Sequence, residues 1–332
     1  MIFQPPILAL LMVAALAALV ALWSGAFAIR VLARWDMANM SRAQLRMERM
    51  AELVSTLFGA VMLAELAALL LFVFNSDRMA SLFVGAMCAV GTLNVNAYGF
   101  PALYLKIGVF FAATLWLILD HADRLGRDFP LTKVKYAALL AIAPLILADG
   151  ATELAYFLNL HTDVITSCCT KLFTPNNPGL ANHMASIGEG TALVWLSVIA
   201  LAVAGSGAYV MLRKRGYWIY ALASGALFVA GLTAIVATIS LYIYEDPNHH
   251  CPFCILKPEY GYFGYVLYVP LFFATAMGLG AGLLQPFANI PSLKGKLPGL
   301  IARQVVWSMI GFALFGLAVI WAIARSHLIL FG

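Results

Sequence analysis

Eight long apolar stretches follow one another along the chain, separated by short polar segments. They cover residues 6–30, 51–74, 101–120, 136–159, 184–211, 217–244, 262–285 and 300–324. The hydrocarbon core of a bilayer is roughly 30 Å thick, and a helix of about 20 apolar residues spans it. A helix also satisfies its own backbone hydrogen bonds in lipid, where water cannot do so. The sequence therefore predicts an all-α fold, a polytopic transmembrane bundle of eight helices.

The composition agrees with a chain that lies almost entirely in lipid. Hydrophobic residues make up 63% of it and charged residues only 11%, which excludes an ordinary soluble surface. Because the eight stretches leave little chain for a soluble domain, we expect residues 1–332 to form a single integral membrane domain. No basic residue precedes the first stretch, so we interpret it as a retained helix rather than a signal peptide. The sequence has no phosphate-loop or dinucleotide motif, and we expect no nucleotide ligand.

The positions of lysine and arginine predict which side of the membrane each loop faces, because basic loops stay in the cytoplasm. One side has Arg30, Arg34, Arg42, Arg46, Arg49, Arg124, Arg127, Lys133, Lys135, Arg213, Lys214, Arg215, Lys294, Lys296 and Arg303. The other side has only Arg78, Lys106, Lys171, Lys257 and Arg325. We therefore expect both termini outside, in a bacterial inner (cytoplasmic) membrane. The net charge of +5 reflects this topology and suits anionic lipid headgroups, so it requires no nucleic-acid partner.

An internal similarity suggests that the chain has two related halves. The segment 98–100, with the sequence Tyr-Gly-Phe, recurs as Tyr-Gly-Tyr at 260–262, an offset of 162 residues. Such an offset fits two parallel four-helix repeats, 1–160 and 184–332, joined by an outer Cys/His loop. Chance recurrence of aromatic and small residues in apolar helices is the alternative. In the repeat register, Cys88 lies one residue away from Cys251.

Four cysteines fall in two loops that the topology places on the periplasmic side. They are the vicinal pair Cys168 and Cys169, and the Cys-Pro-Phe-Cys motif formed by Cys251 and Cys254. In an oxidising compartment these residues can form two structural disulfides. Neighbouring cysteines rarely pair with each other, so each would reach the other loop. On this interpretation the chain is a non-catalytic membrane anchor subunit with disulfide-stapled loops.

The same cysteines also suit electron transfer. A Cys-X-X-Cys pair can hold a reactive thiolate, and a second pair can relay electrons by exchange. Cys251, beside His249 and His250, would attack, Cys254 would resolve, and the vicinal pair would relay. This arrangement is functionally similar to membrane enzymes of the disulfide-forming and vitamin K epoxide reductase type, in which loop cysteines pass electrons to a quinone. Those enzymes are smaller bundles of four or five helices, and they lack the vicinal pair.

Our leading expectation is therefore an inner-membrane electron-transfer protein, a subunit of a respiratory or redox complex. It would exchange electrons between a membrane quinone or quinol and a periplasmic redox partner, as a quinone-linked oxidoreductase of the thiol–disulfide type.

A soft metal ion is the main alternative ligand for these loops. Thiolates and imidazoles together favour Zn or Cu(I). The candidate ligands are His161, His183, His249, His250, Cys251 and Cys254. The chain would then bind or transport the metal. Haem is not expected, because the helix interiors contain no histidine and Cys254 is followed by Ile255 rather than histidine.

Acidic residues inside the apolar stretches form a second group of candidates. Glu65, Asp149, Glu153 and Glu189 lie at depths where a charge costs about 2.5 to 3.5 kcal/mol on insertion scales. We expect them to form a proton or cation path, with the alternatives that Asp149 and Glu153 are protonated and hydrogen-bonded between helices or paired with a residue of a partner subunit. Lys106 is a candidate for binding a quinone carbonyl or an anionic headgroup, and snorkelling to the interface is the alternative.

Overall fold

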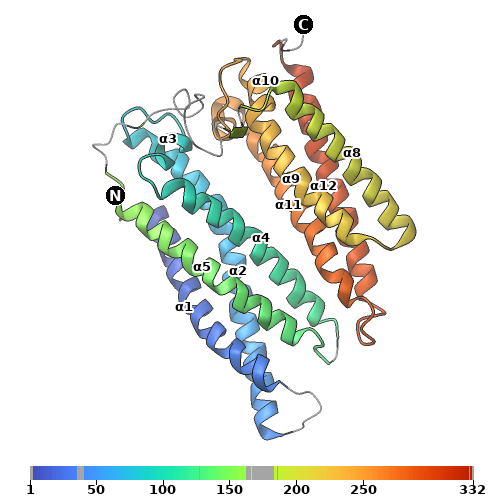
Figure 1. Cartoon of the computed structure of the whole chain (residues 1–332). Helices are drawn as coiled ribbons and strands as arrows, with labels where there is room; N and C mark the ends of the chain where they lie inside the picture. Colours follow the sequence, from blue (N-terminus) through green and yellow to red (C-terminus); the bar gives the residue numbers. More distant parts are fainter. Residues whose placement is uncertain are drawn as a thin grey trace. The chain divides into compact units, whose positions relative to one another are not determined.

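The computed structural model describes residues 3–35, 41–126, 128–161, 166, 183–184, 186–328 and 330. All regular structure in this part of the chain is helical (Figure 1). Eight of its helical segments are long and apolar enough to cross a membrane: Pro5–Arg34, Arg42–Leu82, Gly99–Asp123, Thr132–Leu158, Glu189–Arg213, Tyr217–Tyr244, Phe263–Phe287 and Leu297–Arg325. The expectation of eight long apolar helices is confirmed, and it indicates a multi-pass membrane protein.

The long helices are α1 (Pro5–Arg34), α2 (Arg42–Arg78), α4 (Gly99–Asp123), α5 (Thr132–Leu158), α8 (Glu189–Arg213), α9 (Tyr217–Ala234), α11 (Phe263–Leu284) and α12 (Leu297–Arg325). The short ones are α3 (Ala89–Leu93), α10 (Ser240–Tyr244), the π-helical turn η2 (Ile235–Ile239) and the 3₁₀ turns η1 (Met79–Leu82), η3 (Cys254–Leu256), η4 (Pro258–Tyr260) and η5 (Gln285–Phe287). The turn η2 continues α9 into α10, so the three elements make one membrane span.

Local sequence explains where several helices begin and end. The Ser41 hydroxyl oxygen accepts a hydrogen bond from the backbone N–H of Gln44, 3.2 Å away, and so caps the start of α2. Proline occupies the first turn of α1, where its missing N–H costs nothing. Between α8 and α9, Lys214 and Gly216 both adopt left-handed backbone conformations, with φ of 52° and 81°. They reverse the chain within three residues, which brings α8 and α9 side by side.

The chain forms two compact units. Unit 1 comprises Met1–Met79, Thr92–Val164 and Pro286–Leu297, and unit 2 comprises Ala80–Gly91, Ile165–Gln285 and Pro298–Gly332. The parallel repeat and the outside position of both termini stay predictions.

Unit 1 is built on four long helices that contact one another in a closed ring. Helix α1 packs against α2 and α5, and α4 packs against the same two helices. The core of unit 1 includes an aromatic pair between α2 and α4, in which the rings of Phe58 and Trp116 meet edge to face with centroids 4.7 Å apart. The hydroxyl of buried Tyr136 donates to the Ala51 carbonyl oxygen over 2.6 Å, which joins α5 to α2.

Unit 2 packs α9 against α8 and α11, and α12 contacts all three of these helices. Ser308 of α12 lies at the centre of a polar contact, since its hydroxyl donates to the Ala274 carbonyl over 2.6 Å and accepts from the Tyr220 hydroxyl over 2.8 Å. A Cβ at Gly311 would lie only 2.8 Å from the Ala274 Cβ. Glycine therefore lets α12 approach α11 closely, as small residues do in membrane bundles.

The outer faces of both units are apolar. Leu19 of α1 is 65% exposed, and Leu201 and Leu212 of α8 are 73% and 82% exposed. Soluble proteins rarely expose a continuous apolar surface of this kind. Exposed leucines on helices long enough to cross a bilayer indicate a lipid environment.

Candidate functional site

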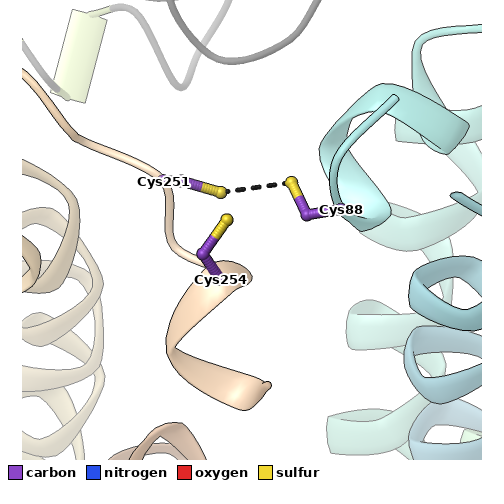
Figure 2. A group of neighbouring side chains, drawn as sticks. All are labelled: Cys88, Cys251 and Cys254. Carbon is purple, nitrogen blue, oxygen red and sulfur yellow. Dashed lines mark hydrogen bonds between the residues drawn. The ribbon is translucent and has the colours of Figure 1, made fainter. Parts of the chain in front are cut away.

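Three cysteines from two distant segments of unit 2 bring their sulfur atoms together (Figure 2). The Sγ atoms of Cys88, Cys251 and Cys254 all lie within 4.8 Å of one another. The Cys88 and Cys251 sulfur atoms are 3.4 Å apart, a hydrogen-bonding contact well beyond the roughly 2.05 Å of a disulfide bond. Cys88 and Cys251 are fully buried, and Cys254 is 7% exposed. We call these residues the three-cysteine cluster.

Cys88 lies in a short loop that glycines fold tightly just before α3. Gly85 has a φ of 86°, a left-handed conformation that favours glycine. A Cβ at Gly91 would lie 2.8 Å from the Ala86 Cα, so the loop closes on itself only because that side chain is absent. Thr166 fixes the loop from another segment, because its N–H donates to the Val84 carbonyl over 3.0 Å and its hydroxyl donates to the Gly91 carbonyl over 2.8 Å.

Two tyrosines from neighbouring membrane spans hold the Cys-Pro-Phe-Cys motif. The Tyr244 hydroxyl donates to the Cys251 carbonyl over 2.5 Å, and the Tyr268 hydroxyl donates to the Pro252 carbonyl over 2.7 Å. Tyr244 ends α10 and Tyr268 belongs to α11, so the motif is fixed to both helices that flank it. Its geometry is therefore set by the helical bundle rather than by the loop alone.

Further contacts fix the Cys254 end of the motif and join it to the Cys88 loop. The ammonium group of Lys257 donates to the Met87 carbonyl, one residue before Cys88. A Cβ at Gly264, near the start of α11, would lie 2.7 Å from Leu256 Cδ2 and 3.1 Å from the Ile255 carbonyl carbon. The missing side chain lets α11 pack directly on the η3 turn that begins with Cys254.

His249 lies beside Cys254 but is not part of the group of ligand atoms that lie within 4.8 Å of one another. Its ring stacks on Tyr244 with centroids 4.1 Å apart and planes inclined by 29°. A hydrogen bond between the His249 side chain and the Cys254 thiol group raises the pKa of His249, and the negative potential of Cys254, Asp246 and Cys88 adds to it against the effect of burial. An imidazolium beside a thiol favours its thiolate form.

His250 points to a different partner. Its Nδ1 atom lies 3.1 Å from the carbonyl oxygen of Val236 in η2. A π-helical turn changes the usual backbone hydrogen-bond pattern, and such turns are frequent at functional sites. The two adjacent histidines of the sequence therefore separate in space, one beside Cys254 and one against the membrane span.

The structure brings together only part of the ligand set expected from the sequence. Cys251, Cys254 and His249 lie together, whereas His161 and His183 are exposed and belong to different units. The group of metal-ligating atoms found among the described residues consists of the three cysteines alone and contains none of the four histidines. Cys168 and Cys169 lie outside the described residues, so the disulfides and the relay expected for them stay predictions.

Cys88 is the member of the cluster that the sequence reasoning did not select. The available signal was the internal offset of 162 residues, which placed Cys88 one residue out of register with Cys251. The separation between the two contacting cysteines is 163 residues. An offset by itself gives no distance in space, so this signal did not identify Cys88 as a ligand.

A second group of functional candidates gathers in unit 1. The Lys106 ammonium lies 2.8 Å from Glu153 Oε2, 3.0 Å from Asp149 Oδ2 and 3.7 Å from Glu65 Oε2. We call these residues the Lys106 cluster: Lys106, Glu65, Asp149 and Glu153. Lys106 is only 3% exposed, so its ammonium does not snorkel to the interface, and the binding of a quinone or headgroup by Lys106 stays a prediction. Lys106 stays buried because its ammonium is attracted by three buried carboxyl groups.

Glu189, the fourth acid expected on a proton or cation path, belongs to unit 2 and is not part of the Lys106 cluster. It is the first residue of α8, where its carbonyl oxygen accepts from the Thr238 hydroxyl over 3.0 Å. An acid at a helix N-terminus interacts favourably with the helix dipole.

Comparison of the chain with models of protein families, with curated proteins and with solved structures found no match.

Proposed function

We propose that this multi-pass membrane protein binds a soft metal ion, Cu(I) or Zn(II), at the three-cysteine cluster with His249. The observation that supports the proposal is the convergence of three buried sulfur atoms within 4.8 Å of one another. Thiolates are the ligands that Cu(I) and Zn(II) prefer among protein groups. His249, whose side chain is hydrogen-bonded to Cys254, provides a fourth ligand from the same loop.

The spacing of the sulfur atoms suits such an ion. A tetrahedral zinc site with Zn–S bonds of about 2.3 Å has its sulfur atoms about 3.8 Å apart. The Cys88–Cys251 separation of 3.4 Å and the limit of 4.8 Å for the whole group lie on either side of this value. Changes of at most about 1 Å in the sulfur separations would therefore complete the site. Metal binding would release the thiol protons, because the metal takes thiolate ligands.

The burial of the sulfur atoms also supports a metal ligand rather than contact with a large protein substrate. Two of the three side chains have no exposed surface. A protein that exchanges disulfides with a partner must expose its attacking sulfur. We further propose that the site faces the periplasm of an inner membrane, as the distribution of basic residues predicts.

Metal content and affinity of the purified full chain test the proposal. We expect one Cu(I) or Zn(II) per chain, and a loss of binding in Cys88→Ser. His249→Gln should weaken the affinity at least about 10-fold, the lower range of effects at metal sites. His183→Gln is the matched control, because His183 is an exposed histidine of the same unit and should leave the affinity unchanged.

Two outcomes would contradict this ligand set. A chain that binds neither ion with its thiols reduced would end the metal proposal. A chain that loses the metal in the double variant Cys168→Ser/Cys169→Ser, while Cys88→Ser keeps it, would move the site to the vicinal pair.

Electron transfer to a quinone is a second candidate, which the 3.4 Å contact between Cys88 and Cys251 favours. In this reaction the two thiols lose two electrons and two protons and form one S–S bond. The quinone takes up both electrons and both protons and becomes a quinol. A periplasmic dithiol partner would then reduce the disulfide by exchange, which requires the loops to open because both sulfur atoms are buried, and electrons would pass from the partner to the quinone.

Thiol trapping separates this candidate from metal binding. The reduced, metal-free chain in oxygen-free detergent is alkylated before and after addition of a soluble ubiquinone analogue. Electron transfer predicts loss of two alkylated cysteines and a Cys88–Cys251 disulfide in the peptide map. Thiols that stay fully alkylated after addition of quinone would exclude it.

A further inference from the structure

The Lys106 cluster has an excess of acid that no described residue balances. Three carboxyl groups, from α2 and α5, face one ammonium group from α4. All four side chains are at most 3% exposed. With every group ionised the cluster would carry two uncompensated negative charges in the apolar part of the bundle, which is strongly unfavourable.

The described helices that carry or contact the cluster place no further cation beside it. On α2 the nearest cation to Glu65 is Arg78, 13 residues further along the helix and so about 20 Å away. On α5 the next titratable side chain is Tyr156, whose hydroxyl donates to the Thr92 carbonyl over 3.2 Å. On α4, Tyr104 is 43% exposed. Helix α1, which packs on α2 and α5, has no titratable side chain between residue 5 and Ile29. The charge must therefore be balanced by protons or by a bound cation.

A second buried ionic group in the same unit shows what a balanced network looks like. Lys135 lies 2.9 Å from Asp120 Oδ1 and 2.9 Å from Asp123 Oδ2, and Arg124 lies 2.8 Å from Asp120 Oδ2. Two acids there face two bases. This balanced group is 14 residues further along α4 than Lys106, about 21 Å at 1.5 Å per residue. With every side chain ionised, the group of Asp120, Asp123, Arg124 and Lys135 is therefore neutral, whereas the Lys106 cluster has a net negative charge.

The carboxyl oxygens of the Lys106 cluster also include atoms without a partner. Among the residues that the structure describes, Glu153 Oε1 and Asp149 Oδ1 are buried and have no hydrogen-bond partner, and buried Glu65 Oε2 has only its 3.7 Å ionic contact with the Lys106 ammonium, which is beyond hydrogen-bonding distance. Buried polar oxygens are normally satisfied. These unsatisfied oxygens are the atoms to which protons would bind, so they provide a second indication of a missing ligand.

We propose that the Lys106 cluster is a proton-exchange site whose three carboxyl groups together hold two protons while Lys106 stays charged. Two neutral carboxylic acids and one carboxylate beside the ammonium give the site zero net charge. Release of one proton leaves two carboxylates beside one ammonium, a net charge of −1, and uptake of a proton from water restores the neutral state. This property belongs to unit 1 and does not require the cysteines of unit 2.

Infrared spectroscopy of the full chain in lipid nanodiscs tests the proposal through the carbonyl band of protonated carboxylic acids. The neutral site holds one proton fewer than its number of carboxyl groups. Glu153→Gln or Asp149→Asn should therefore halve the band that the cluster contributes at neutral pH. Lys106→Met should increase it about 1.5-fold, because all three acids then take a proton. The band should also shift in D₂O, since the protons exchange with water.

Asp120→Asn is the matched control. It removes a buried carboxylate from the balanced group and should leave the band of protonated acids unchanged. If Glu153→Gln fails to fold, Lys106→Met and the D₂O shift of the unaltered chain still decide the question.

Three results would overturn the proposal. The absence of a protonated-acid band would mean that the carboxyl groups are ionised. A band that shrinks when Na⁺ replaces choline would make a metal cation the ligand. A band that does not shift in D₂O would show permanently sealed acids rather than an exchange site.

Discussion

At the scale of single residues, the three-cysteine cluster depends on nearby glycines as much as on the cysteines. Gly264 allows α11 to contact the η3 turn, and Gly91 allows the Cys88 loop to fold tightly. The Cys88 loop and the Cys-Pro-Phe-Cys motif are each held by a side-chain hydroxyl that donates to their backbone, from Thr166 and Tyr244 respectively. This brings the Cys88 and Cys251 sulfur atoms within hydrogen-bonding distance. Small residues therefore set the sulfur geometry that the proposed metal ion requires.

We expect Gly264→Ala to weaken both the fold and the metal site. Its Cβ would lie 2.7 Å from Leu256 Cδ2 and 3.1 Å from backbone of Ile255, so the turn beginning at Cys254 must shift. Overpacking of this kind costs about 1–3 kcal/mol. Denaturation in detergent and Cu(I) titration would measure the two effects.

Gly205→Ala is the matched control for that substitution. Gly205 lies in α8 and no atom is within 4 Å of a Cβ placed there. Alanine should stabilise the helix by up to about 1 kcal/mol and leave metal affinity unchanged. Equal effects of both substitutions would contradict a packing role for Gly264.

At the scale of elements, α4 and α5 are joined by the balanced ionic group next to their connection. The Asp123 carboxylate accepts from the Leu131 N–H over 2.8 Å and also pairs with Lys135. Asp120 accepts from the Ser55 hydroxyl of α2 over 2.5 Å. One group of side chains thus fixes the connection and ties it to a third helix.

We expect Lys135→Gln to destabilise unit 1 far more than Arg124→Gln. Both cations contact Asp120, but the Lys135 side chain is 6% exposed and that of Arg124 is 45% exposed. Removing a buried partner leaves an uncompensated charge and costs about 3–5 kcal/mol. Loss of an exposed partner costs about 0–1 kcal/mol. Unfolding in detergent at equal lipid content would measure the difference, and similar losses for both variants would refute the assignment.

At the scale of the whole molecule, the eight spans give each loop a definite side of the membrane. Basic residues predict that the loop with Cys251 lies outside and that the segment before α12 lies inside. Asn248 and Gly295 are exposed residues of these two segments. They are suitable reporters of the topology because neither contributes to the clusters.

Labelling of intact cells with an impermeant maleimide tests this topology. In a chain whose native cysteines are replaced by serine, Asn248→Cys should be labelled directly. Gly295→Cys should be labelled only after the cells are permeabilised. The reverse pattern would put the three-cysteine cluster on the cytoplasmic side and contradict the periplasmic partner proposed above.

The amino-acid sequence by itself determined the number and approximate position of the membrane-spanning helices. Their cause is local, because each run of apolar residues partitions into lipid and forms its own backbone hydrogen bonds. It also singled out Cys251, Cys254 and the buried acids, since thiols in a spaced motif and charges in apolar stretches are unusual wherever they occur.

Only the tertiary structure decided which of these groups meet. Cys88 joins Cys251 across 163 residues, and Lys106 reaches carboxyl groups on two other helices. Such contacts depend on how helices pack and how loops close, which are properties of many residues acting together. Composition and spacing show which side chains can take part in chemistry, but their distances arise from the packing of the folded chain.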